Sequence, residues 1–397
     1  MINLFLIPSW YPSASSPLSG VFTQEQAQAI AELSSDVRVM VSLWGHADGV
    51  LNASRPWVWP GRILWNLKQP RNRITVRHGV HEVFNSQITW SDRLPFGGAR
   101  QIINVNRRNF VLAQEKFGPV DLIHAHVSYP GGYVAALLAK EFGVPYVITE
   151  HMSPFPFPSL MNGGQPIREI GDSFERAAAS IAVSPSLAKR IASFGYPMPR
   201  VVPNLVDERS FALGEPQSEK MVFFTLCAIS EQKGIDHLLE AIAHWNPPAA
   251  QFEFRIGGDG PQRSHYQAKS IELGLGDRVK WLGAVSRETA PNLFRQCHIY
   301  VMPSRHETFG VVYAEAIACG KPIIATRCGG PEFIVNEGNG LLVNVGDVSA
   351  LSLAMQKMAT NWAHYKPTAI RQDFEKRFSR HAVVSQLRSL YNEVLKK

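Results

Sequence analysis

The sequence predicts an α/β protein made of two doubly wound units, and three observations lead to this expectation. With 397 residues, the chain exceeds the size at which one hydrophobic core usually stops growing, so two domains of roughly 200 residues are expected. Short apolar runs typical of buried strands alternate with helical runs along both halves. Hydrophobic residues make up 45% and charged residues 18% of the chain, which is a globular and not a disordered composition.

The first half begins with an apolar strand at residues 2–8, followed by a loop rich in Pro, Ser and Gly and then by a helix. At the start of this helix Thr23 and Gln26 fit a capping box, and Phe22 and Ala27 fit its hydrophobic staple. Further buried strands are expected in "VRVMVSL", "DLIHAH" and "PYVIT", and a helix in "GGYVAALLAKEFG". These elements predict a first Rossmann-like domain over residues 1–204.

The alternation restarts after "VVPNLVD" and predicts a second Rossmann-like domain over residues 205–375. Strands are expected in "MVFFTLCAI", "FEFRIGG", "RVKWLG", "IYVMP" and "KPIIAT", with helices in "GIDHLLEAIAHW" and "PNLFRQC". The last helical segment, residues 376–397, is amphipathic, and the sequence leaves open whether it packs back on the first domain. Ligands of such sheets lie outside the carboxyl ends of the strands, so two facing units predict a cleft between domains.

The amino terminus has no basic lead and only a short apolar run, and no stretch of about 18 apolar residues occurs. We therefore expect a cytoplasmic protein. Its four cysteines form no CxxC pair and lack histidines at zinc-ligand spacing, so we expect reduced thiols and no metal.

Two glutamates, Glu307 and Glu315, stand with seven residues between them in "SRHETFGVVYAEAIACGKPII". Glu307 falls in the loop after a strand, and Glu315 about two turns into the next helix. The start of a helix offers free N–H groups and the positive end of its dipole, which suit a phosphate. Taken alone, Glu315 also fits a solvated helix residue, and Glu307 a charge favoured by the dipole.

Other strand ends carry residues of the same kind. In "SEQKG", Lys233 follows the first strand of the second domain, where a cation would face a diphosphate. "GGDGP", with Gly258 and Gly260, follows the next strand, and "RCGGPEFI" follows a later one. A lone lysine or a Gly-rich turn is usually structural, but such features at successive strand ends together indicate a nucleotide site.

These motifs resemble those of the retaining GT-B glycosyltransferases with the E-x7-E motif, family four, group 1 type. The resemblance covers nearly the whole chain and rests on the combination of several segments. They are "SWYP", "PLSGVFTQEQAQAIAEL", "ITEH", "VVPNLVD", "SEQKGIDHLLEAI", "GGDGP", "RVKWLG", "MPSRHETFGVVYAEAIACGKPIIAT" and "GGPEFIVNEGNGLLV".

The resemblance implies a metal-independent enzyme without a cofactor that transfers a sugar from a UDP- or GDP-sugar. We expect the first domain, residues 1–204, to bind the acceptor and the second, residues 205–375, to bind the nucleotide sugar. It implies that Glu307 lies near the donor sugar, that Glu315 holds the ribose hydroxyls and that Lys233 neutralises the diphosphate. The candidate catalytic residues are Glu307, His151 and Lys233. The candidate donor-binding residues are Gly20, Lys233, Gly258, Gly260, Arg305, Thr308, Phe309, Gly310, Val311 and Glu315.

One position departs from the family pattern. Most relatives carry an arginine five positions before the lysine, where this chain has Ala228. A missing guanidinium removes a bidentate partner of the diphosphate, so another group should replace it. Arg305 is our candidate.

The resemblance also implies retention of anomeric configuration and a glycan or lipid-linked acceptor in bacterial-type polysaccharide or glycolipid biosynthesis. We expect an oxocarbenium-like path in which the leaving phosphate helps to accept the acceptor proton. The alternatives are a GT-B sugar-nucleotide epimerase or phosphorylase and a noncatalytic scaffold that binds nucleotide or membrane. A dinucleotide-dependent dehydrogenase fits less well, because the first loop lacks GxGxxG.

Two histidine positions call for different interpretations. His124 and His126 alternate along one strand and resemble a metal pair, but without further ligands nearby we interpret them as structural. His151 follows a strand end and precedes a loop rich in Pro and Gly, where substrates are usually recognised. The resemblance implies that it contacts the transferred sugar or shapes the reacting face.

The positive charge of the chain, +7 overall, is concentrated between residues 55 and 108. Ten basic residues there stand against Glu82 and Asp92, an excess of eight positive charges. Tryptophans and phenylalanines, Trp57 and Phe96 among them, are interleaved with these cations. A solvated face beside core aromatics is the plain alternative, but we expect a dock for an anionic membrane surface and no nucleic-acid partner.

Overall fold

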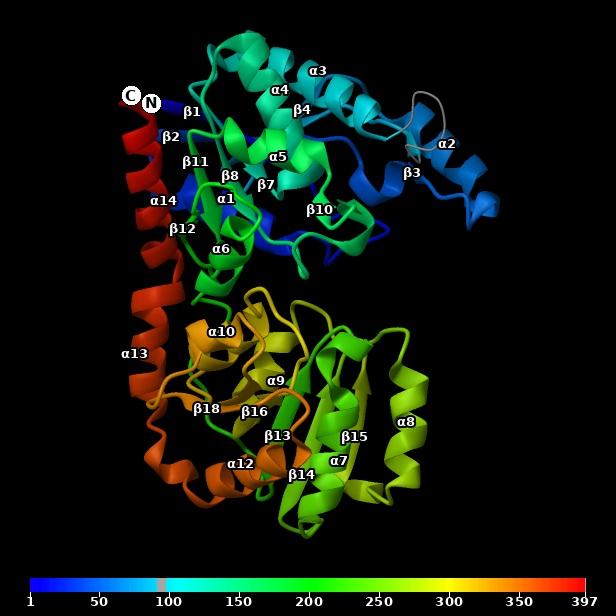
Figure 1. Cartoon of the computed structure of the whole chain (residues 1–397), viewed down its shortest axis with the longest axis vertical. Coiled ribbons are helices and arrows are strands. Elements are labelled where there is room, and N and C mark those ends of the chain that lie inside the picture. The colour runs from blue at the N-terminus through cyan, green and yellow to red at the C-terminus, as the bar shows by residue number, and fades with distance from the viewer. Residues whose placement is uncertain (91–97, 397) are drawn as a thin grey trace. The chain divides into compact units, whose positions relative to one another are not determined.

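The computed structural model describes residues 1–90 and 98–396. By its internal contacts the chain divides into two compact units (Figure 1). Unit 1 comprises Met1–Val183, Ala188–Val202 and the chain from Val383 on, and unit 2 comprises Ser184–Leu187 and Pro203–Ala382. No helix among the described residues is long and apolar enough to span a membrane.

Unit 1 is built on an eight-stranded sheet in which all neighbours are parallel except the edge pair β4–β5. Its strands, in sheet order, are β12 (Arg200–Val201), β11 (Ala179–Ala182), β8 (Tyr146–Glu150), β7 (Leu122–His126), β1 (Ile2–Pro8), β2 (Val37–Leu43), β5 (Val80–Phe84) and β4 (Arg73–Arg77). A separate two-stranded pair joins β3 (Val50–Leu51) to β6 (Thr89–Trp90). Its helices include α1 (Val21–Leu33), α2 (Trp59–Lys68), α3 (Ala99–Phe117), α4 (Tyr133–Phe142) and α5 (Arg168–Glu175). Helix α6 (Pro185–Ala192) begins among the residues of unit 2 and continues in unit 1 from Ala188.

The core of unit 1 lies between the central strands and helices α3 and α4. Phe5 of β1 meets Phe110 of α3 edge to face, with ring centroids 5.1 Å apart, and both side chains are fully buried. Ile123 of β7 and Val134 of α4 belong to the same cluster. Burying such a side chain stabilises the fold by about 1.5–3 kcal/mol.

Unit 2 is a six-stranded, wholly parallel sheet. Its order is β15 (Val279–Gly283), β14 (Phe252–Gly257), β13 (Met221–Leu226), β16 (Ile299–Met302), β17 (Ile323–Thr326) and β18 (Gly340–Val343). One group of helices packs α7 (Ile235–Trp245) against α8 (Arg263–Glu272) and α12 (Val348–Thr360), and another packs α10 (Val311–Ala318) against α9 (Ala290–Gln296), α11 (Pro331–Ile334) and α13 (Pro367–Phe378). Both units are therefore Rossmann-like.

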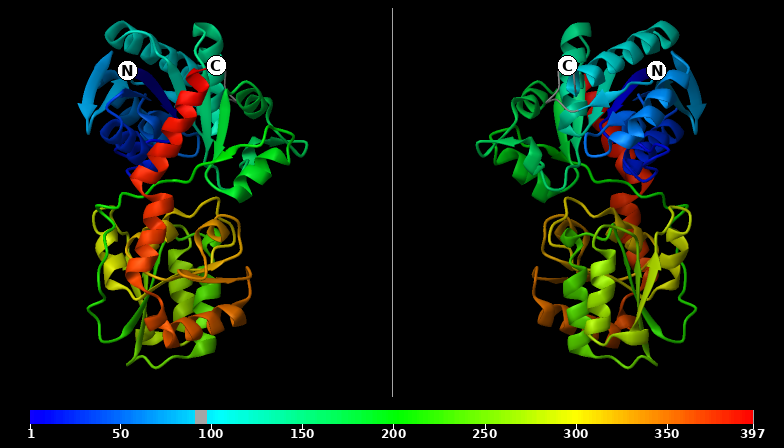
Figure 2. Two further views of the ribbon diagram at one scale, coloured as in Figure 1. Left: turned by 90° about the vertical axis from the view of Figure 1, so that its left-hand side faces the viewer. Right: turned by 90° about the vertical axis from the view of Figure 1, so that its right-hand side faces the viewer.

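The final helix, α14 (Arg380–Leu395), groups with unit 1 from Val383 on. Figure 2 shows it in red along the elements of unit 1. The hydroxyl of Tyr391 lies 2.7 Å from His124 Nδ1 in the sheet, and Arg388 pairs with Asp36. The sequence had left open which domain receives this helix, and these contacts attach it to unit 1.

The predicted capping box at the start of α1 is wrong. The helix begins at Val21 with Gly20 as its N-cap, and no side chain caps it. Thr23 lies inside the first turn, buried, and its Oγ1 has no hydrogen-bond partner among the described residues. The local sequence fitted a capping box at Thr23, but the chain enters the helix three residues earlier.

Replacing Thr23 by valine should leave the melting temperature unchanged or raise it, because an unpaired buried hydroxyl is removed at nearly constant shape. Thr23→Ser is the matched control, since it keeps the hydroxyl and loses a methyl group. A loss of about 1 kcal/mol in Thr23→Val but not in Thr23→Ser would restore the capping role. Thermal unfolding of the purified variants measures both.

Candidate active site

The site of unit 2 lies where its strand order reverses direction. β13 and β16 are neighbours, but the chain runs outward from β13 to β14 and from β16 to β17 on opposite sides. Loops that leave such a pair of strands diverge and open a crevice at the carboxyl ends. Lys233 follows β13 and Glu307 follows β16, so both predicted residues flank this switch point.

Lys233 and Glu307 form an ion pair there. The Lys233 Nζ lies 2.6 Å from Glu307 Oε1, and Ser304 Oγ donates to the same oxygen at 2.9 Å. Glu307 is only 6% exposed. Burial lowers the pKa of the Lys233 ammonium, but the charge and hydrogen bond of Glu307 outweigh this effect, so the pKa is raised. The lysine is therefore held as a cation at neutral pH.

The start of helix α10 adds backbone donors beside this pair. Gly310, the N-cap, has φ 85°, and a Cβ there would lie 2.5 Å from the Tyr313 ring. The amide of Tyr313 bonds to Gly310 O, whereas no acceptor for the amides of Phe309, Gly310 and Val311 is found among the described residues. Orphan amides at a helix start suit an anion.

The carbonyl of Thr308 anchors the loop before α10. Ser184 Oγ donates to Thr308 O at 2.5 Å, and both residues belong to unit 2. Phe309 is buried, and its ring meets Phe378 edge to face at 5.7 Å. These two contacts hold the backbone of the loop that carries the unpaired amides.

Glu315 has a partner that the sequence did not suggest. It is buried on α10 and forms an ion pair with Arg287. Arg287 lies in the loop after β15, and its guanidinium stacks over the Phe211 ring, 4.8 Å from the centroid. The same rule that singled out Lys233, a cation after a strand end, would have found Arg287.

Arg305, our candidate for the missing arginine, is held by other groups in this structure. Its guanidinium forms two parallel bonds to Asp236, of 3.0 and 2.6 Å, and donates to Glu231 O at 2.6 Å. Ala228, the position at which the family pattern led us to expect an arginine, is exposed. The role of Arg305 toward a diphosphate stays a prediction that requires the pair with Asp236 to rearrange.

The predicted donor-binding glycines also have structural reasons to be glycine. A Cβ at Gly258 would lie 1.8 Å from Cys227 O, and one at Gly260 would lie 2.3 Å from Ile229 O. The turn of Gly258 and Gly260 thus packs closely against the loop after β13. In unit 1, Gly20 has φ 69°, and its Cβ would lie 2.1 Å from Trp10 O.

Unit 1 has its own switch point between β1 and β7, and buried histidines gather near it. His126 Nδ1 lies 3.1 Å from His151 Nε2, and the two rings stack. Glu150, the last residue of β8, accepts the amides of Ser128, His151 and Met152 at 2.7 to 2.9 Å. Burial raises the pKa of Glu150, and these bonds oppose it. His151 is therefore positioned through both its ring and its backbone.

His124 and His126 have the structural surroundings that the sequence interpretation favoured. His124 is held between Tyr391 and Thr149 Oγ1, at 2.7 and 2.8 Å. Among the described residues, no group of three or more His, Cys, Asp or Glu side chains could hold a metal ion. All four cysteines are free thiols.

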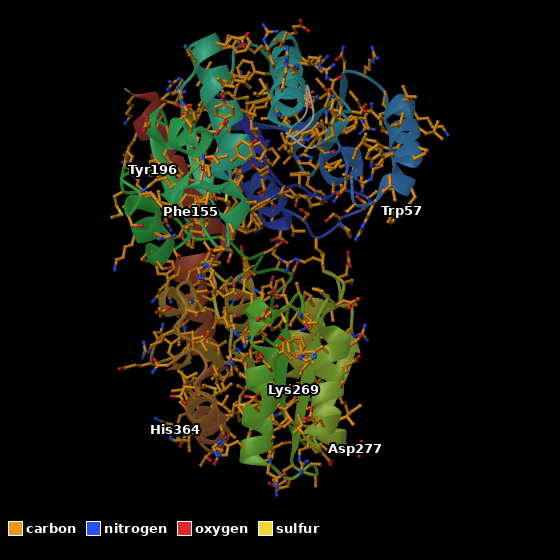
Figure 3. The ribbon with its side chains drawn as sticks, turned by 45° about the vertical axis from the view of Figure 1, so that its right-hand side comes forward. Trp57, Phe155, Tyr196, Lys269, Asp277 and His364 are labelled. Carbon is orange, nitrogen blue, oxygen red and sulfur yellow. The ribbon has the colours of Figure 1, made fainter. Side chains whose placement is uncertain are left out.

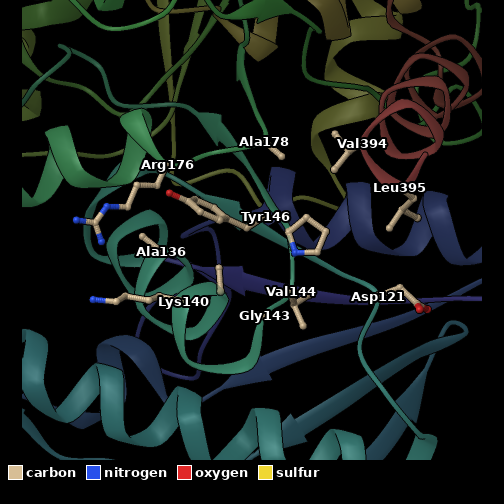
Figure 4. Close-up of a pocket in the computed structure, with 12 residues that line it drawn as sticks. Asp121, Ala136, Lys140, Gly143, Val144, Tyr146, Arg176, Ala178, Val394 and Leu395 are labelled. Carbon is tan, nitrogen blue, oxygen red and sulfur yellow. The ribbon is translucent and has the colours of Figure 1, made fainter. Parts of the chain in front are cut away.

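A separate cavity of about 860 Å³ in unit 1 lies away from these strand ends. Tyr146, the first residue of β8, and Gly143, which ends α4, line it together with Lys140 and Arg176 (Figure 4). The cavity therefore opens at the amino end of β8, whereas His151 follows its carboxyl end. None of the predicted site residues lines it.

Comparison with known proteins identifies the class of this fold. The structure of sucrose-phosphate synthase from Thermosynechococcus elongatus matches with a TM-score of 0.74 at 20% identity, covering 100% of both chains. HepE of Anabaena in complex with UDP matches with a TM-score of 0.70 at 20% identity over 99% of this chain and 100% of HepE. The fold is the GT-B fold of glycosyltransferases.

The sequence comparisons place the chain within a family. Residues 206–377 match the family "Glycosyl transferases group 1", and residues 20–210 match "Glycosyltransferase Family 4". An uncharacterized glycosyltransferase of Methanocaldococcus jannaschii is 30% identical over 69% of this chain and 76% of its own length. A putative teichuronic acid biosynthesis glycosyltransferase, TuaC of Bacillus subtilis, is 27% identical over 90% and 89%. The chain belongs to the group 1 glycosyltransferases of family 4.

Removing the lysine of the buried pair should destabilise unit 2. In Lys233→Met the Glu307 carboxylate loses its cation, and we expect the unfolding free energy of unit 2 to fall by about 3 kcal/mol. Adding Glu307→Gln should recover part of this loss. The Arg107–Glu141 pair, 2.5 Å apart but exposed, is the matched control, and Arg107→Met should cost less than about 1 kcal/mol. Equal losses in chemical unfolding would contradict the account.

Acid should weaken unit 1 through His126. Burial lowers the pKa of His126 from 6.5 to about 3, so between these values the unfolded chain binds a proton that the folded chain does not. Stability is therefore present at neutral pH and is lost as the pH falls below 6.5, by up to about 1.4 kcal/mol per pH unit. Urea unfolding between pH 7 and 5 should show a shallower loss in His126→Phe, and an unchanged slope would refute this assignment.

Proposed function

We propose that this protein is a retaining glycosyltransferase that moves a sugar from a UDP- or GDP-sugar to a glycan or lipid-linked acceptor. The observation that carries the proposal is the Lys233–Glu307 pair at the switch point of unit 2, beside the start of α10. Relatives support the substrate class. HepE of Anabaena has been crystallised with UDP-glucose, and LpsE of Rhizobium meliloti, 28% identical over 47% of this chain, carries a name from lipopolysaccharide core biosynthesis.

The leaving diphosphate is the group that this site would stabilise. As the bond from the anomeric carbon to the diphosphate breaks, negative charge grows on the phosphate oxygens. An ammonium carries three N–H donors, and Glu307 takes one from Lys233, which leaves others for the diphosphate. The amides of Phe309, Gly310 and Val311 would donate hydrogen bonds to a second phosphate oxygen. Donors fixed in advance at the place of developing charge are the largest source of acceleration in many enzymes.

The acceptor hydroxyl attacks the anomeric carbon from the same face of the sugar that the diphosphate leaves. Its oxygen forms the new bond to the anomeric carbon, and its proton passes to an oxygen of the departing phosphate, so that atoms and charges balance. In this scheme Glu307 keeps Lys233 protonated and lies near the sugar, and no metal is required. Glu315 with Arg287 would meet the ribose hydroxyls, and His151 the transferred sugar.

The donor should be identified first and the pair tested next. A thermal-shift panel of UDP-, GDP- and ADP-sugars should show one nucleotide class that raises the melting temperature, because ligands of the native state stabilise it.

With that donor, Lys233→Met and Glu307→Gln should each lower the rate of nucleoside diphosphate release by about 10²–10³-fold. Lys357→Met, an exposed lysine of α12, is the control and should not change it.

Four outcomes would contradict the proposal. Near wild-type release in Lys233→Met would remove the lysine from the mechanism. Isomerisation of the donor sugar without release would indicate an epimerase, and binding without turnover a scaffold. Inversion at the anomeric carbon, followed by NMR of the product, would exclude the retaining path.

A further inference from the structure

Helix α2 of unit 1 presents its apolar side to solvent. Ile63, Leu64 and Leu67 are 44%, 52% and 75% exposed, and Trp57 in the short turn before the helix is 73% exposed. With 3.6 residues per turn, positions 63, 64 and 67 share one side of the helix. We call Trp57, Ile63, Leu64 and Leu67 the α2 face. Figure 3 labels Trp57 beside the blue helix at the margin of unit 1.

The opposite side of α2 attaches the helix to unit 1. No residue of α2 is fully buried, but those of the opposite side are partly covered and make contacts with the neighbouring loops. These contacts are Trp59 Nε1 to Asn52 O at 2.9 Å, Arg62 to Val50 O, Ser86 Oγ to Asn66 O at 3.2 Å, and the Trp65 ring against Gly45. A core-facing helix turns its apolar side toward the protein. Helix α2 does the opposite, because the side with polar residues and tryptophans faces the protein and the aliphatic side faces solvent.

The charged residues of the chain segment that contains the α2 face are all positive. Residues 49–81 contain six lysines and arginines and no carboxylate. Arg55, Lys68 and Arg71, at the two ends of α2, are exposed, and within the described part of the chain none of them has an ion-pair partner.

Other arginines of the basic segment are held by partners outside the α2 face. Four of its arginines have partners elsewhere: Arg73 lies over the Phe84 ring, Arg77 pairs with Glu82, Arg107 with Glu141, and Arg108 with Gln87. Arg93 and Phe96 fall outside the described residues. The sequence had grouped residues 55–108 together, and the structure narrows the candidate surface to the surroundings of α2.

We propose that the α2 face is a docking surface for an anionic lipid bilayer. Trp57 and the three aliphatic side chains enter the interface between headgroups and acyl chains, and Arg55, Lys68 and Arg71 contact the phosphates. An exposed apolar side flanked by cations, in a segment of the chain without carboxylates, matches such a bilayer in both chemistry and charge. A nucleic acid would match the cations but not the aliphatic side chains. This inference goes beyond the proposed transfer reaction and does not depend on the donor.

Flotation with vesicles of stated composition tests the proposal. The full-length protein should float with vesicles of phosphatidylcholine containing phosphatidylglycerol, less with pure phosphatidylcholine, and less as salt rises. Leu64→Ser/Leu67→Ser should weaken binding by at least about tenfold, and Lys68→Glu/Arg71→Glu by about 25-fold or more. These side chains are exposed, so the melting temperatures should stay at the wild-type value.

Matched controls lie on unit 2. Ile271→Ser/Leu353→Ser removes two aliphatic side chains that are 79% and 64% exposed, and Lys357→Glu/Lys376→Glu reverses two exposed lysines. Both should bind vesicles as the wild type does. Absence of binding to anionic vesicles at low salt, or equal losses in control and α2 variants, would overturn the proposal. A third outcome would also overturn it: the wild type forms a dimer and binds no vesicles, and Leu64→Ser/Leu67→Ser converts the dimer to monomers. In that case a second copy of the chain would cover the α2 face.

Discussion

The candidate site depends on one buried ion pair, between Lys233 and Glu307, at the point where the strand order of unit 2 reverses. The sheet alone would bring both side chains to the same crevice, because β13 and β16 are adjacent and parallel. The ion pair then determines the protonation state of the lysine and the orientation of the carboxylate. Glu307 keeps the lysine protonated despite its burial, and Ser304 orients the carboxylate. A cation kept in place beside free helix amides needs little rearrangement when a diphosphate arrives, which is the condition under which electrostatic catalysis is most effective.

Unit 1 uses burial in a different way. Its histidines lie in a chain from Tyr391 on the last helix to His151 after β8, and each ring contacts the next. Burial keeps His124 and His126 neutral by lowering their pKa values. Neutral, packed imidazoles hold His151 without adding charge to unit 1. The attachment of α14 through Tyr391 also makes this arrangement depend on the carboxyl-terminal end of the chain.

The sequence predicted the two Rossmann-like units and most strands of their two large sheets, because buried parallel strands leave continuous apolar runs. It also placed Lys233 and Glu307 at strand ends, which the structure brings within 2.6 Å. It failed where the partner is distant in sequence or where a local pattern is ambiguous. Arg287 meets Glu315 only through the fold, the Thr23 capping pattern was displaced by a glycine cap, and Arg305 is taken by Asp236. The outward-facing aliphatic side of α2 could not be told from a core-facing side by periodicity alone.

The central claim is that Lys233 and the amides before α10 bind a diphosphate, and a difference in affinity tests it most directly. Calorimetric titration would compare the nucleoside diphosphate with its nucleoside, for the wild type and for Lys233→Met, in the presence of EDTA. The account predicts that the wild type prefers the diphosphate strongly and that the variant loses at least about tenfold of this preference, as expected for a charged hydrogen bond. A preference that is the same in both proteins, or that vanishes in the wild type when EDTA is added, would contradict it.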